Sequence, residues 1–342
     1  MQLYVDIEKR LGAFHLRAQF EASSEKLALL DASGCGKSMT LKCIAGIERP
    51  DRGRIVLDGV TLFDSERHID LPPQRRQVGY LLQQYALFPN MTAAQNIRCV
   101  LRGGTRAERK CELDELIRRF RLEGLEKKLP SQLSGRQQQR VALARILAAK
   151  PKAVLLDEPF SALDSFLKWN LEAELADMLA QFEGPIVWVS HDLSECCRNC
   201  ARVCVMENGR SGREMDMEEM IRHPDSVSAA RLAGHKNFVS AAADKNGGVL
   251  VPAWGMRLPE LQLEQAEGTL CIPQSAIDPS GSDYAWRVRR VVADVEHTIV
   301  LLAPDGAPAD AEQLRVELPS ERAPQTGELM RFSIRPEALL LY

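Results

Sequence analysis

The sequence lacks an excess of basic residues, and it has no long hydrophobic run. Its 44 Lys and Arg are balanced by 47 Asp and Glu, which gives a formal net charge of -3. Domains that bind nucleic acid through a basic surface usually have a pI above about 9, so a pI near 6.1 argues against a nucleic-acid partner. No apolar run approaches the ~20 residues that cross a bilayer, and residues 1–10 alternate like a strand, unlike a signal peptide. We expect a soluble, intracellular chain.

Cysteine is scattered except for one cluster of four, at Cys196, Cys197, Cys200 and Cys204. Four thiols so close together could surround a zinc ion. However, no C-x-x-C pair repeats at a finger-like spacing, and Cys204 lies in an apolar run, where a small thiol packs like alanine. The odd total of 9 also argues against a disulfide framework. We therefore expect packing in this cluster in preference to metal binding.

Hydrophobic periodicity divides the chain into two parts. Residues 1–232 alternate short apolar runs with amphipathic stretches, which is typical of an α/β domain with a mostly parallel sheet. The apolar runs 27–30, 153–156 and 186–189 each end where polar residues begin, and open α/β sheets bind ligands at the carboxyl ends of their strands. Residues from about 95 to 150 predict a helical insertion with a charged outer face.

Residues 233–342 have a different hydrophobic pattern. Short β-type runs are separated by Gly, Pro and Asp, which predicts a small all-β, barrel-like domain. These runs are 249–252, 287–292, 298–302, 314–318 and 329–334. The expected fold class is thus an α/β nucleotide-binding domain with a helical subdomain, followed by a small all-β domain.

Residues 31–38, DASGCGKS, follow the apolar run 27–30 and precede a helix-like stretch. They match the phosphate-binding pattern G-x-x-x-x-G-K-[ST] at all but its first position. Glycines let backbone amides approach a polyphosphate, the helix start adds positive charge, the lysine reaches the β/γ-phosphates, and the serine hydroxyl binds Mg²⁺. The alternative is a glycine-rich turn with an incidental Lys-Ser. The predicted nucleotide contacts are Ser33, Gly34, Cys35, Gly36, Lys37, Ser38 and Met39.

Asp31 stands where the pattern has its first glycine. A carboxylate ~6 Å from a phosphate charge would cost roughly 3 kcal/mol at an effective dielectric constant of ~20. A positive φ at this position would add ~1–2 kcal/mol. The side chain could instead point to solvent, and both interpretations remain open at this stage.

The apolar run 153–156 delivers two acids, Asp157 and Glu158. We predict that Asp157 binds Mg²⁺ and that Glu158 polarises a water molecule for in-line attack on the γ-phosphate. Strand ends are often acidic, so the pair alone is weak evidence, and its weight comes from the motifs around it.

Four further segments resemble the motifs of ABC-type ATPases. Residues 133–137, LSGRQ, are similar to the L-S-G-G-Q signature, and residues 161–164, SALD, resemble the D-loop. Residues 190–192, SHD, resemble the switch-histidine segment, and Gln83 is similar to the Q-loop glutamine. With the phosphate-binding loop and the acidic pair, these segments occur in the family's order over some 160 residues of the chain.

The resemblance implies two such domains, a homodimer, closing around two ATP molecules with Mg²⁺. It implies that the signature residues face the γ-phosphate held by the partner's loop, that His191 contacts this phosphate, and that Gln83 positions Mg²⁺ or water. Without the other motifs, His191 could equally be a strand-end histidine with local partners. The signature and D-loop residues so implied are Ser134, Gly135, Gln137 and Asp164.

Two further positions depart from the family pattern. Arg136 replaces the second signature glycine, and it could obstruct the approach of phosphate or add favourable charge. Leu11 occupies the usual place of the aromatic residue that stacks on adenine. The string Lys-Arg-Leu-Gly-x-Phe resembles one in molybdate-importer ATPases, which makes Phe14 the candidate for adenine contact.

Residues 71–76 and 85–92 are similar to the molybdate/sulfate branch of importer ATPases and to its relatives for polyamines, iron and sugars. The tail resembles the oligobinding-type (TOBE-like) domain of that group, either as a dimerisation module or as an oxyanion sensor. The resemblance implies a subunit at the cytoplasmic face of the cell membrane that hydrolyses ATP to import an oxyanion such as molybdate or sulfate. Its partners would be permease subunits and, through them, an extracytoplasmic substrate-binding protein.

Three alternatives are considered. The first is a regulatory nucleotide-binding protein whose catalysis is weakened by Asp31 and Arg136, although Lys37, Asp157 and Glu158 are all present. The second is an importer ATPase for a polyamine, iron or a sugar. The third, a soluble ABC ATPase acting on DNA or ribosomes, is disfavoured by the acidic charge balance and the β-rich tail.

Overall fold

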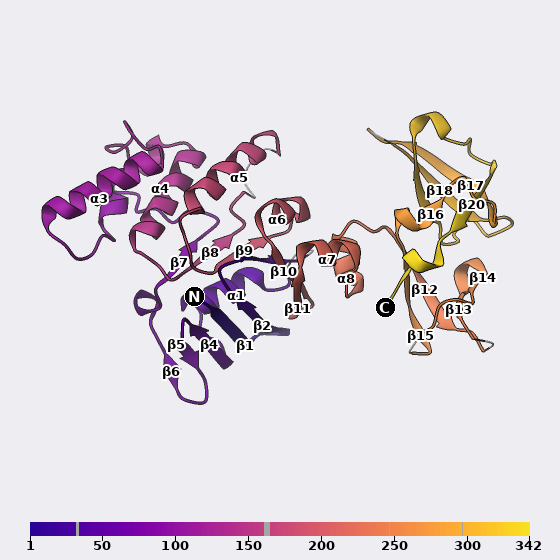
Figure 1. The fold of residues 1–342 in the computed structure, drawn as a ribbon, viewed down its shortest axis with the longest axis horizontal. Helices are drawn as coiled ribbons and strands as arrows, with labels where there is room; N and C mark the ends of the chain where they lie inside the picture. Colours follow the sequence, from indigo (N-terminus) through magenta and orange to yellow (C-terminus); the bar gives the residue numbers. More distant parts are fainter. Residues whose placement is uncertain (32–33, 161–164, 246, 264, 296) are drawn as a thin grey trace. The chain divides into compact units, whose positions relative to one another are not determined.

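The computed structural model describes residues 1–342 apart from 32–33, 161–164, 246, 264 and 296, and it does not describe the side chains of 165–167, 169 and 170. The chain folds into two units, Met1–Glu218 and Glu219–Tyr342 (Figure 1). The division lies fourteen residues before the boundary expected at 232. Among the described residues, no helix is long and apolar enough to span a bilayer.

One large sheet forms the centre of unit 1. Its strand order among the described residues is β6-β5-β4-β1-β2-β11-β10-β3-β9-β8-β7, and the five strands from β10 to β7 pair in parallel. Every residue of β8 and β9 is buried, as expected for short apolar strands covered on both faces. These five strands are β10 (Arg202–Glu207), β3 (Lys26–Leu30), β9 (Ile186–Ser190), β8 (Ala153–Asp157) and β7 (Val78–Leu81).

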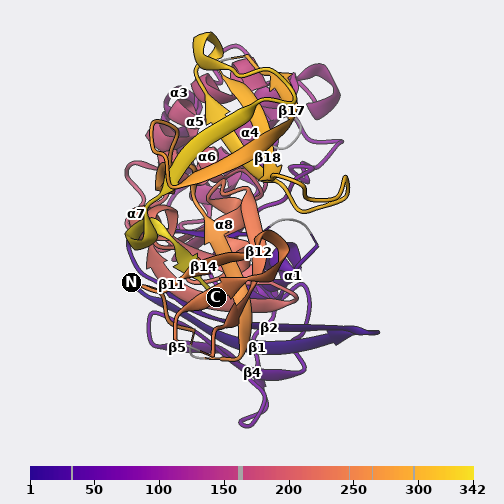
Figure 2. The same cartoon turned by 90° about the vertical axis from the view of Figure 1, so that its right-hand side faces the viewer.

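The other half of the sheet is mostly antiparallel. β1 and β2 pair along their whole lengths, and in Figure 2 they run side by side with β4. Buried and exposed residues alternate along β2, because one face of the strand packs on the core. The strands of this half are β1 (Leu3–Leu11), β2 (Phe14–Ala22), β4 (Arg52–Leu57), β5 (Val60–Asp64), β6 (Ile69–Asp70) and β11 (Arg210–Asp216).

The helical insertion predicted near 95–150 contains three helices. α3 buries Leu116 and Ile117 and exposes most of its charged residues, and it stops before Phe120, which is fully buried. Charged residues continue after α3, but Arg121 has a φ of 50°, so the helix does not extend towards residue 129. The helices of unit 1 are α1 (Lys37–Ala45), α2 (Ala93–Arg98), α3 (Arg106–Arg119), α4 (Gly135–Ala148), α5 (Ser165–Leu179) and α6 (Leu193–Asn199), with 3-10 turns at Pro73–Arg75 and Pro130–Gln132.

A buried arginine fixes the C-terminal end of α1. The Arg76 side chain is 1% exposed, and its guanidinium donates to the carbonyl oxygens of Cys43 (2.7 Å), Ile44 (3.0 Å) and Leu71 (2.7 Å) and to Asp70 Oδ1 (2.8 Å). The last carbonyls of a helix have no partner within the helix and carry partial negative charge. Arg76 therefore satisfies the end of α1 and joins it to the segment that leads into β7.

Among its described residues, unit 2 contains two five-stranded sheets that share one hydrophobic core. Trp254, Trp286 and Phe332 pack edge-to-face in this core. Asn237 connects the sheets, because its side chain bonds to the backbone of Ile272 in one sheet and of Arg315 in the other.

The small all-β domain predicted for the tail is confirmed, and two short helices, α7 (Met217–Arg222) and α8 (Val227–Leu232), precede its strands. The first sheet comprises β12 (Asn237–Ala243), β13 (Val249–Val251), β14 (Met256–Leu258), β15 (Glu267–Ile272) and β21 (Leu340–Leu341). The second comprises β16 (Ile277–Asp278), β17 (Tyr284–Ala293), β18 (Thr298–Pro304), β19 (Leu314–Leu318) and β20 (Leu329–Ile334).

Candidate nucleotide-binding site

The register of the parallel strands brings the predicted motifs to one edge of the sheet. Leu30, the last residue of β3, pairs with Ser190 of β9, and Asp157 of β8 pairs with Val189. The phosphate-binding loop, the acidic pair and the switch-histidine segment therefore leave the sheet at the same level. This edge is where open α/β sheets bind their ligands.

The phosphate-binding loop adopts a conformation that requires glycine at two places. Gly34 has φ 78° and Gly36 has φ 95°, and a Cβ at Gly36 would lie 2.8 Å from the Leu16 side chain. α1 begins directly after Gly36 with Lys37, whose side chain is 6% exposed, and Ser38 and Met39 follow in its first turn. Burial lowers the pKa of the Lys37 ammonium, and the nearby carboxylates of Glu158 and Asp157 oppose that shift. Ser33 lies outside the described residues.

Asp31 does not point to solvent. Its side chain is buried, and it forms an ion pair with Lys37 Nζ through Oδ1. Its other oxygen, Oδ2, accepts a hydrogen bond from the backbone N–H of Cys35 at 3.0 Å. Asp31 is not among the residues with positive φ, so the backbone strain considered for this position does not arise.

Ser38, Asp157 and Tyr80 form a hydrogen-bonded group beside the loop. Ser38 Oγ donates to Asp157 Oδ1 at 2.8 Å, and the Tyr80 hydroxyl donates to Asp157 Oδ2 at 2.7 Å. Mg²⁺ in nucleotide sites prefers carboxylate, hydroxyl and phosphate oxygens. A hydroxyl and a carboxylate already in contact next to Lys37 fit that requirement, so Ser38 and Asp157 are suited to hold the ion.

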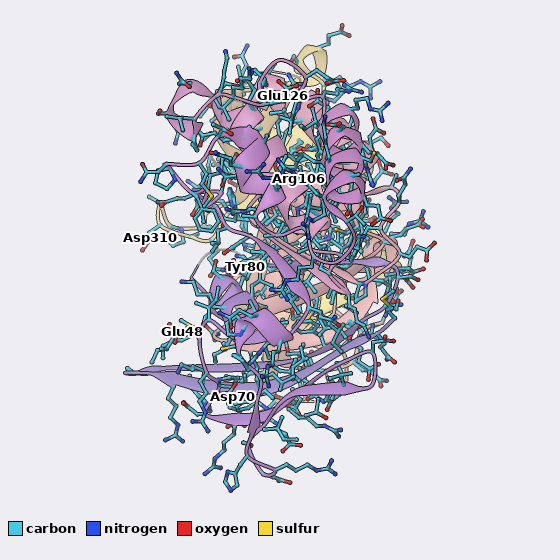
Figure 3. All side chains as sticks on the ribbon, turned by 90° about the vertical axis from the view of Figure 1, so that its left-hand side faces the viewer. Glu48, Asp70, Tyr80, Arg106, Glu126 and Asp310 are labelled. Carbon is cyan, nitrogen blue, oxygen red and sulfur yellow. The ribbon has the colours of Figure 1, made fainter. Side chains whose placement is uncertain are left out.

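Tyr80 was not singled out in the sequence, although it precedes Leu81 at the end of β7, which pairs in parallel with β8. Figure 3 labels it near the middle of unit 1, between the helical part that carries Arg106 and the antiparallel strands near Asp70. Burial, followed by the hydrogen bond to Asp157, raises the pKa of the Tyr80 hydroxyl far above its usual range. Tyr80 therefore stays a neutral donor that orients the carboxylate. The available signal was a tyrosine on the strand beside the acidic pair.

Glu158 and His191 lie next to each other. His191 Nδ1 is 3.5 Å from Glu158 Oε1, and the two side chains are 56% and 27% exposed. Glu158 has a φ of 46°, a left-handed conformation that costs roughly 1–2 kcal/mol for a residue with a Cβ. Its backbone N–H donates to the Val189 carbonyl at 3.0 Å, which holds the residue in place. Strained residues of this kind are concentrated at functional sites.

Gln83 lies two residues beyond β7, in an exposed turn. Because β7 pairs in parallel with β8, residues that follow β7 leave the sheet at the same edge as Asp157. The structure therefore places Gln83 on the side of the sheet that carries the acidic pair.

The signature segment forms the start of α4. Ser134 caps the helix: its Oγ accepts the Gln137 N–H at 3.3 Å, and Gln137 Oε1 accepts the Ser134 N–H at 3.0 Å. Gly135 is the first helical residue, and a Cβ added there would contact nothing within 4 Å. Ser134 and Gly135 are exposed, so the helix start can receive an anion from outside. Asp164 lies outside the described residues.

Arg136 turns back onto its own unit. Its guanidinium forms an ion pair with Glu174 of α5, and Nε donates to Glu174 Oε2 at 3.1 Å. Arg140 Nη2 donates to the same oxygen at 2.8 Å, and Arg121 lies 3.9 Å from Oε1. Glu174 therefore joins three arginines. Its role was not predicted from the sequence, because it lies 38 positions after Arg136. The pair holds the Arg136 side chain beside the start of α4.

Phe14 lies against the phosphate-binding loop. Its ring comes within 3.3 Å of a Cβ built on Gly36, and it lines a cavity of about 440 Å³ with Gly34, Cys35 and Arg210. Leu11, at the usual place of the aromatic residue, is exposed and does not line this cavity. An aromatic ring and a guanidinium beside the loop are suited to contact a flat heterocycle.

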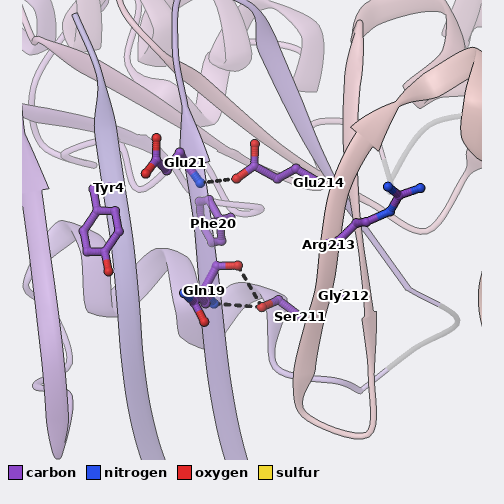
Figure 4. A pocket seen from close by; sticks show the side chains of 8 residues that line it. All are labelled: Tyr4, Gln19, Phe20, Glu21, Ser211, Gly212, Arg213 and Glu214. Carbon is purple, nitrogen blue, oxygen red and sulfur yellow. Dashed lines mark hydrogen bonds between the residues drawn. The ribbon is translucent and has the colours of Figure 1, made fainter. Parts of the chain in front are cut away.

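A second cavity, of about 540 Å³, separates β2 from β11 (Figure 4). The two strands pair only at Arg17 and Arg210. Beyond that point Ser211 Oγ accepts the Gln19 N–H at 2.7 Å and donates to the Gln19 carbonyl at 3.0 Å, and Glu214 accepts the Glu21 N–H. Side chains thus replace the missing backbone hydrogen bonds between the two strands, and none of the residues that line the cavity belongs to a predicted motif.

The cysteine cluster does not gather into one site. Cys196, Cys200 and Cys204 are buried and Cys197 is exposed. Burial raises the pKa of Cys200 to about 12, so its thiol stays protonated. Among the residues that the structure describes, no group of three or more His, Cys, Asp or Glu side chains could hold a metal ion.

Comparisons with known proteins identify the family. The family model described as ABC transporter matches residues 18–161. The molybdate/tungstate import ATP-binding protein WtpC of Archaeoglobus fulgidus is 41% identical over 220 residues, which are 64% of this chain and 89% of that protein. The molybdenum import ATP-binding protein ModC of Paramagnetospirillum magneticum is 36% identical, over 65% of this chain and 61% of its own length. The putrescine transport ATP-binding protein PotG of Escherichia coli is 40% identical, over 62% and 55%.

Solved structures agree with these relatives. The dimeric post-hydrolysis structure of the ATP-binding cassette MJ0796 with ADP and Pi has a TM-score of 0.53 and 27% identity, and covers 64% of this chain and 99% of that one. The ATP-binding subunit of an ABC transporter has a TM-score of 0.55 and 26% identity, over 68% and 97%. The loop, the acidic pair and these relatives together show that this chain belongs to the ABC transporter ATP-binding proteins, ATPases that bind ATP with Mg²⁺.

Proposed function

We propose that this chain is the ATP-hydrolysing subunit of an importer for an oxyanion of the molybdate, tungstate or sulfate type. It acts at the cytoplasmic face of the cell membrane as a homodimer. Its partners are permease subunits and, through them, an extracytoplasmic substrate-binding protein. The observation that carries the proposal is the contact of Ser38 with Asp157 beside Lys37 and Glu158, in a chain similar to molybdate/tungstate import ATP-binding proteins.

The proposed roles follow from where each side chain lies. Lys37 and the amides after Gly34 hold the phosphates, and Ser38 and Asp157 hold Mg²⁺. ATP supplies the phosphoanhydride bond whose cleavage drives the cycle. Glu158 is the general base: it accepts a proton from the attacking water. His191, 3.5 Å from Glu158, restrains that carboxylate and faces the γ-phosphate.

The remaining predicted residues form the outer parts of the proposed site. Phe14 packs against adenine in the cavity beside the loop, and Gln83 reports the occupancy of the Mg²⁺ site to the permease. The start of α4 completes the partner subunit's site, because Ser134 and Gly135 are exposed there and helix starts bind anions. The proposed nucleotide and dimer contacts also include Ser33, Cys35, Met39, Gln137 and Asp164.

The oxyanion is favoured as cargo by the relatives. WtpC and several ModC proteins are import ATP-binding proteins for molybdate, tungstate or molybdenum, and CysA of Synechocystis is one for sulfate and thiosulfate. PotG and PotA are polyamine transport proteins at 40% identity, so polyamine import is the competing assignment.

Uptake in the source organism tests the proposal. Deletion of the gene should abolish uptake of labelled molybdate at limiting concentration, and the wild-type gene should restore it. Glu158→Gln should not restore uptake, although the purified variant should still bind MgATP and dimerise with it, because only the general base is removed. Excess tungstate and sulfate should compete in the restored strain, and putrescine should not. Unchanged oxyanion uptake with lost putrescine uptake would transfer the assignment to polyamines.

A further inference from the structure

The phosphate-binding loop contains a carboxylate that contacts the loop's own donors. Asp31 is buried, and each of its oxygens has a different partner: Lys37 Nζ on one side and the Cys35 backbone N–H, at 3.0 Å, on the other. An ammonium and backbone N–H groups are the donors that such loops offer to phosphate oxygens. The Asp31 carboxylate therefore binds the loop as an anionic ligand would.

Asp31 is one of several carboxylates near Lys37. The carboxylates of Glu158 and Asp157 also favour its charged form. Asp31 adds a third carboxylate around one buried ammonium. The Mg²⁺ that Asp157 is suited to hold would offset part of this negative charge, but the Asp31 carboxylate contacts Lys37 itself and would still repel an incoming phosphate.

We propose that the Asp31 carboxylate is an internal competitor of the nucleotide phosphates: it occupies Lys37 and the Cys35 N–H in the nucleotide-free protein and must leave them before MgATP or MgADP binds. The inference concerns the ATP site and does not depend on which solute is imported. It makes Asp31 a residue that sets the nucleotide concentration at which the site fills.

Isothermal titration with MgADP tests the proposal, because ADP carries a phosphate that reaches this loop and is not hydrolysed. Asp31→Asn keeps the size of the side chain and removes its charge. We expect MgADP to bind Asp31→Asn about 10- to 100-fold more tightly than the wild-type chain, since a buried ion pair no longer has to be broken. Asp31→Gly, which restores the common loop residue, should shift the affinity in the same direction.

A matched control is available on the surface. Asp58 also forms an ion pair with a lysine, Lys152 Nζ at 2.9 Å, and lies on a turn before β5. Its φ of 50° suits asparagine, so Asp58→Asn should fold normally and leave the MgADP affinity unchanged.

Thermal unfolding supplies a second readout. Without nucleotide, Asp31→Asn should melt below the wild-type chain, because Lys37 loses a buried partner. In saturating MgADP its midpoint should rise by more than the wild-type midpoint does, because tighter binding stabilises the folded state further.

Equal or weaker MgADP binding by both Asp31 variants would overturn the proposal and make Asp31 a structural support of the loop. Absence of MgADP binding by the wild-type chain and by both variants would overturn the nucleotide site itself.

Discussion

We expect the loss of the Glu174 carboxylate to destabilise the ATP-binding unit, even when the substituted side chain has almost the same size. Glu174→Gln replaces a carboxylate that Arg136, Arg140 and Arg121 all approach, and leaves three guanidinium groups around a neutral amide. Burial lowers the pKa of Arg140, and the charges of Arg136 and Arg121 lower it further; Glu174 is the carboxylate that its guanidinium contacts, at 2.8 Å.

The magnitude follows mainly from the charge-assisted hydrogen bond that Glu174 accepts from Arg140 at 2.8 Å, because the Arg136 donor is 41% exposed. Such a bond contributes about 1.5–3 kcal/mol when the pair is shielded from water, and its loss leaves the buried guanidinium of Arg140 without this counter-charge. The side chains of Glu174 and Arg140 are 14% and 15% exposed, so we expect the free energy of unfolding to fall by about 3 kcal/mol. For a unit of this size that lowers Tm by about 6–12 °C.

Arg136→Ala is the matched control. The Arg136 side chain is 41% exposed, and solvent screens its pair with Glu174, so its removal should cost only about 0.5–1 kcal/mol. Calorimetric unfolding of both single variants and of the double variant, without nucleotide, gives the coupling energy. If Glu174→Gln lowered Tm no more than Arg136→Ala does, the argument that one carboxylate joins three arginines would be refuted.

Three other predictions concern stability and thiol reactivity. Lys168→Met should lower the free energy of unfolding by about 3 kcal/mol, because it leaves the 3% exposed Glu195 carboxylate without the ammonium 2.7 Å away; an unchanged denaturant midpoint would contradict this. At pH 8 an alkylating reagent should label the exposed Cys111 and spare Cys43, because burial raises the pKa of Cys43 to about 12; mass spectrometry of the peptides decides between them. Asn237→Ala should destabilise unit 2 by about 2–3 kcal/mol, since two hydrogen bonds that join its sheets and one within the first sheet are lost, and calorimetry showing an unshifted unit 2 transition would argue against that role.

The individual strands, which depend on local sequence patterns, were predictable. The strands near 27–30, 153–156 and 186–189 are confirmed as β3, β8 and β9, because short apolar runs bounded by polar residues have few other ways to be buried. The strands of the tail were predictable for the same kind of reason. Parallel pairing then explains how Asp157 comes to lie beside Ser38, 119 positions earlier.

Side-chain partners across long separations were not predictable. Sequence allowed Asp31 to face either solvent or phosphate, and the structure shows a third arrangement, an ion pair with Lys37. Arg136 was weighed against phosphate alone, because nothing near it in the sequence indicates a carboxylate on α5. Tyr80 has no predicted role in the sequence, and its bond to Asp157 depends on the order of strands in the sheet. Such pairings are decided by tertiary packing, which local patterns do not encode.

Arg76 restricts how the nucleotide-binding helix can move. One planar cation bonds to two carbonyl oxygens in the last turn of α1, to the Leu71 carbonyl oxygen and to the Asp70 carboxylate, and a lysine, with its donors on a single nitrogen, could not span that set. The C-terminal end of α1 is thus anchored to the segment that leads into β7. A backbone movement that accompanies ligand binding is then confined to the N-terminal end of α1, where Gly36 and its neighbours have the necessary conformational freedom.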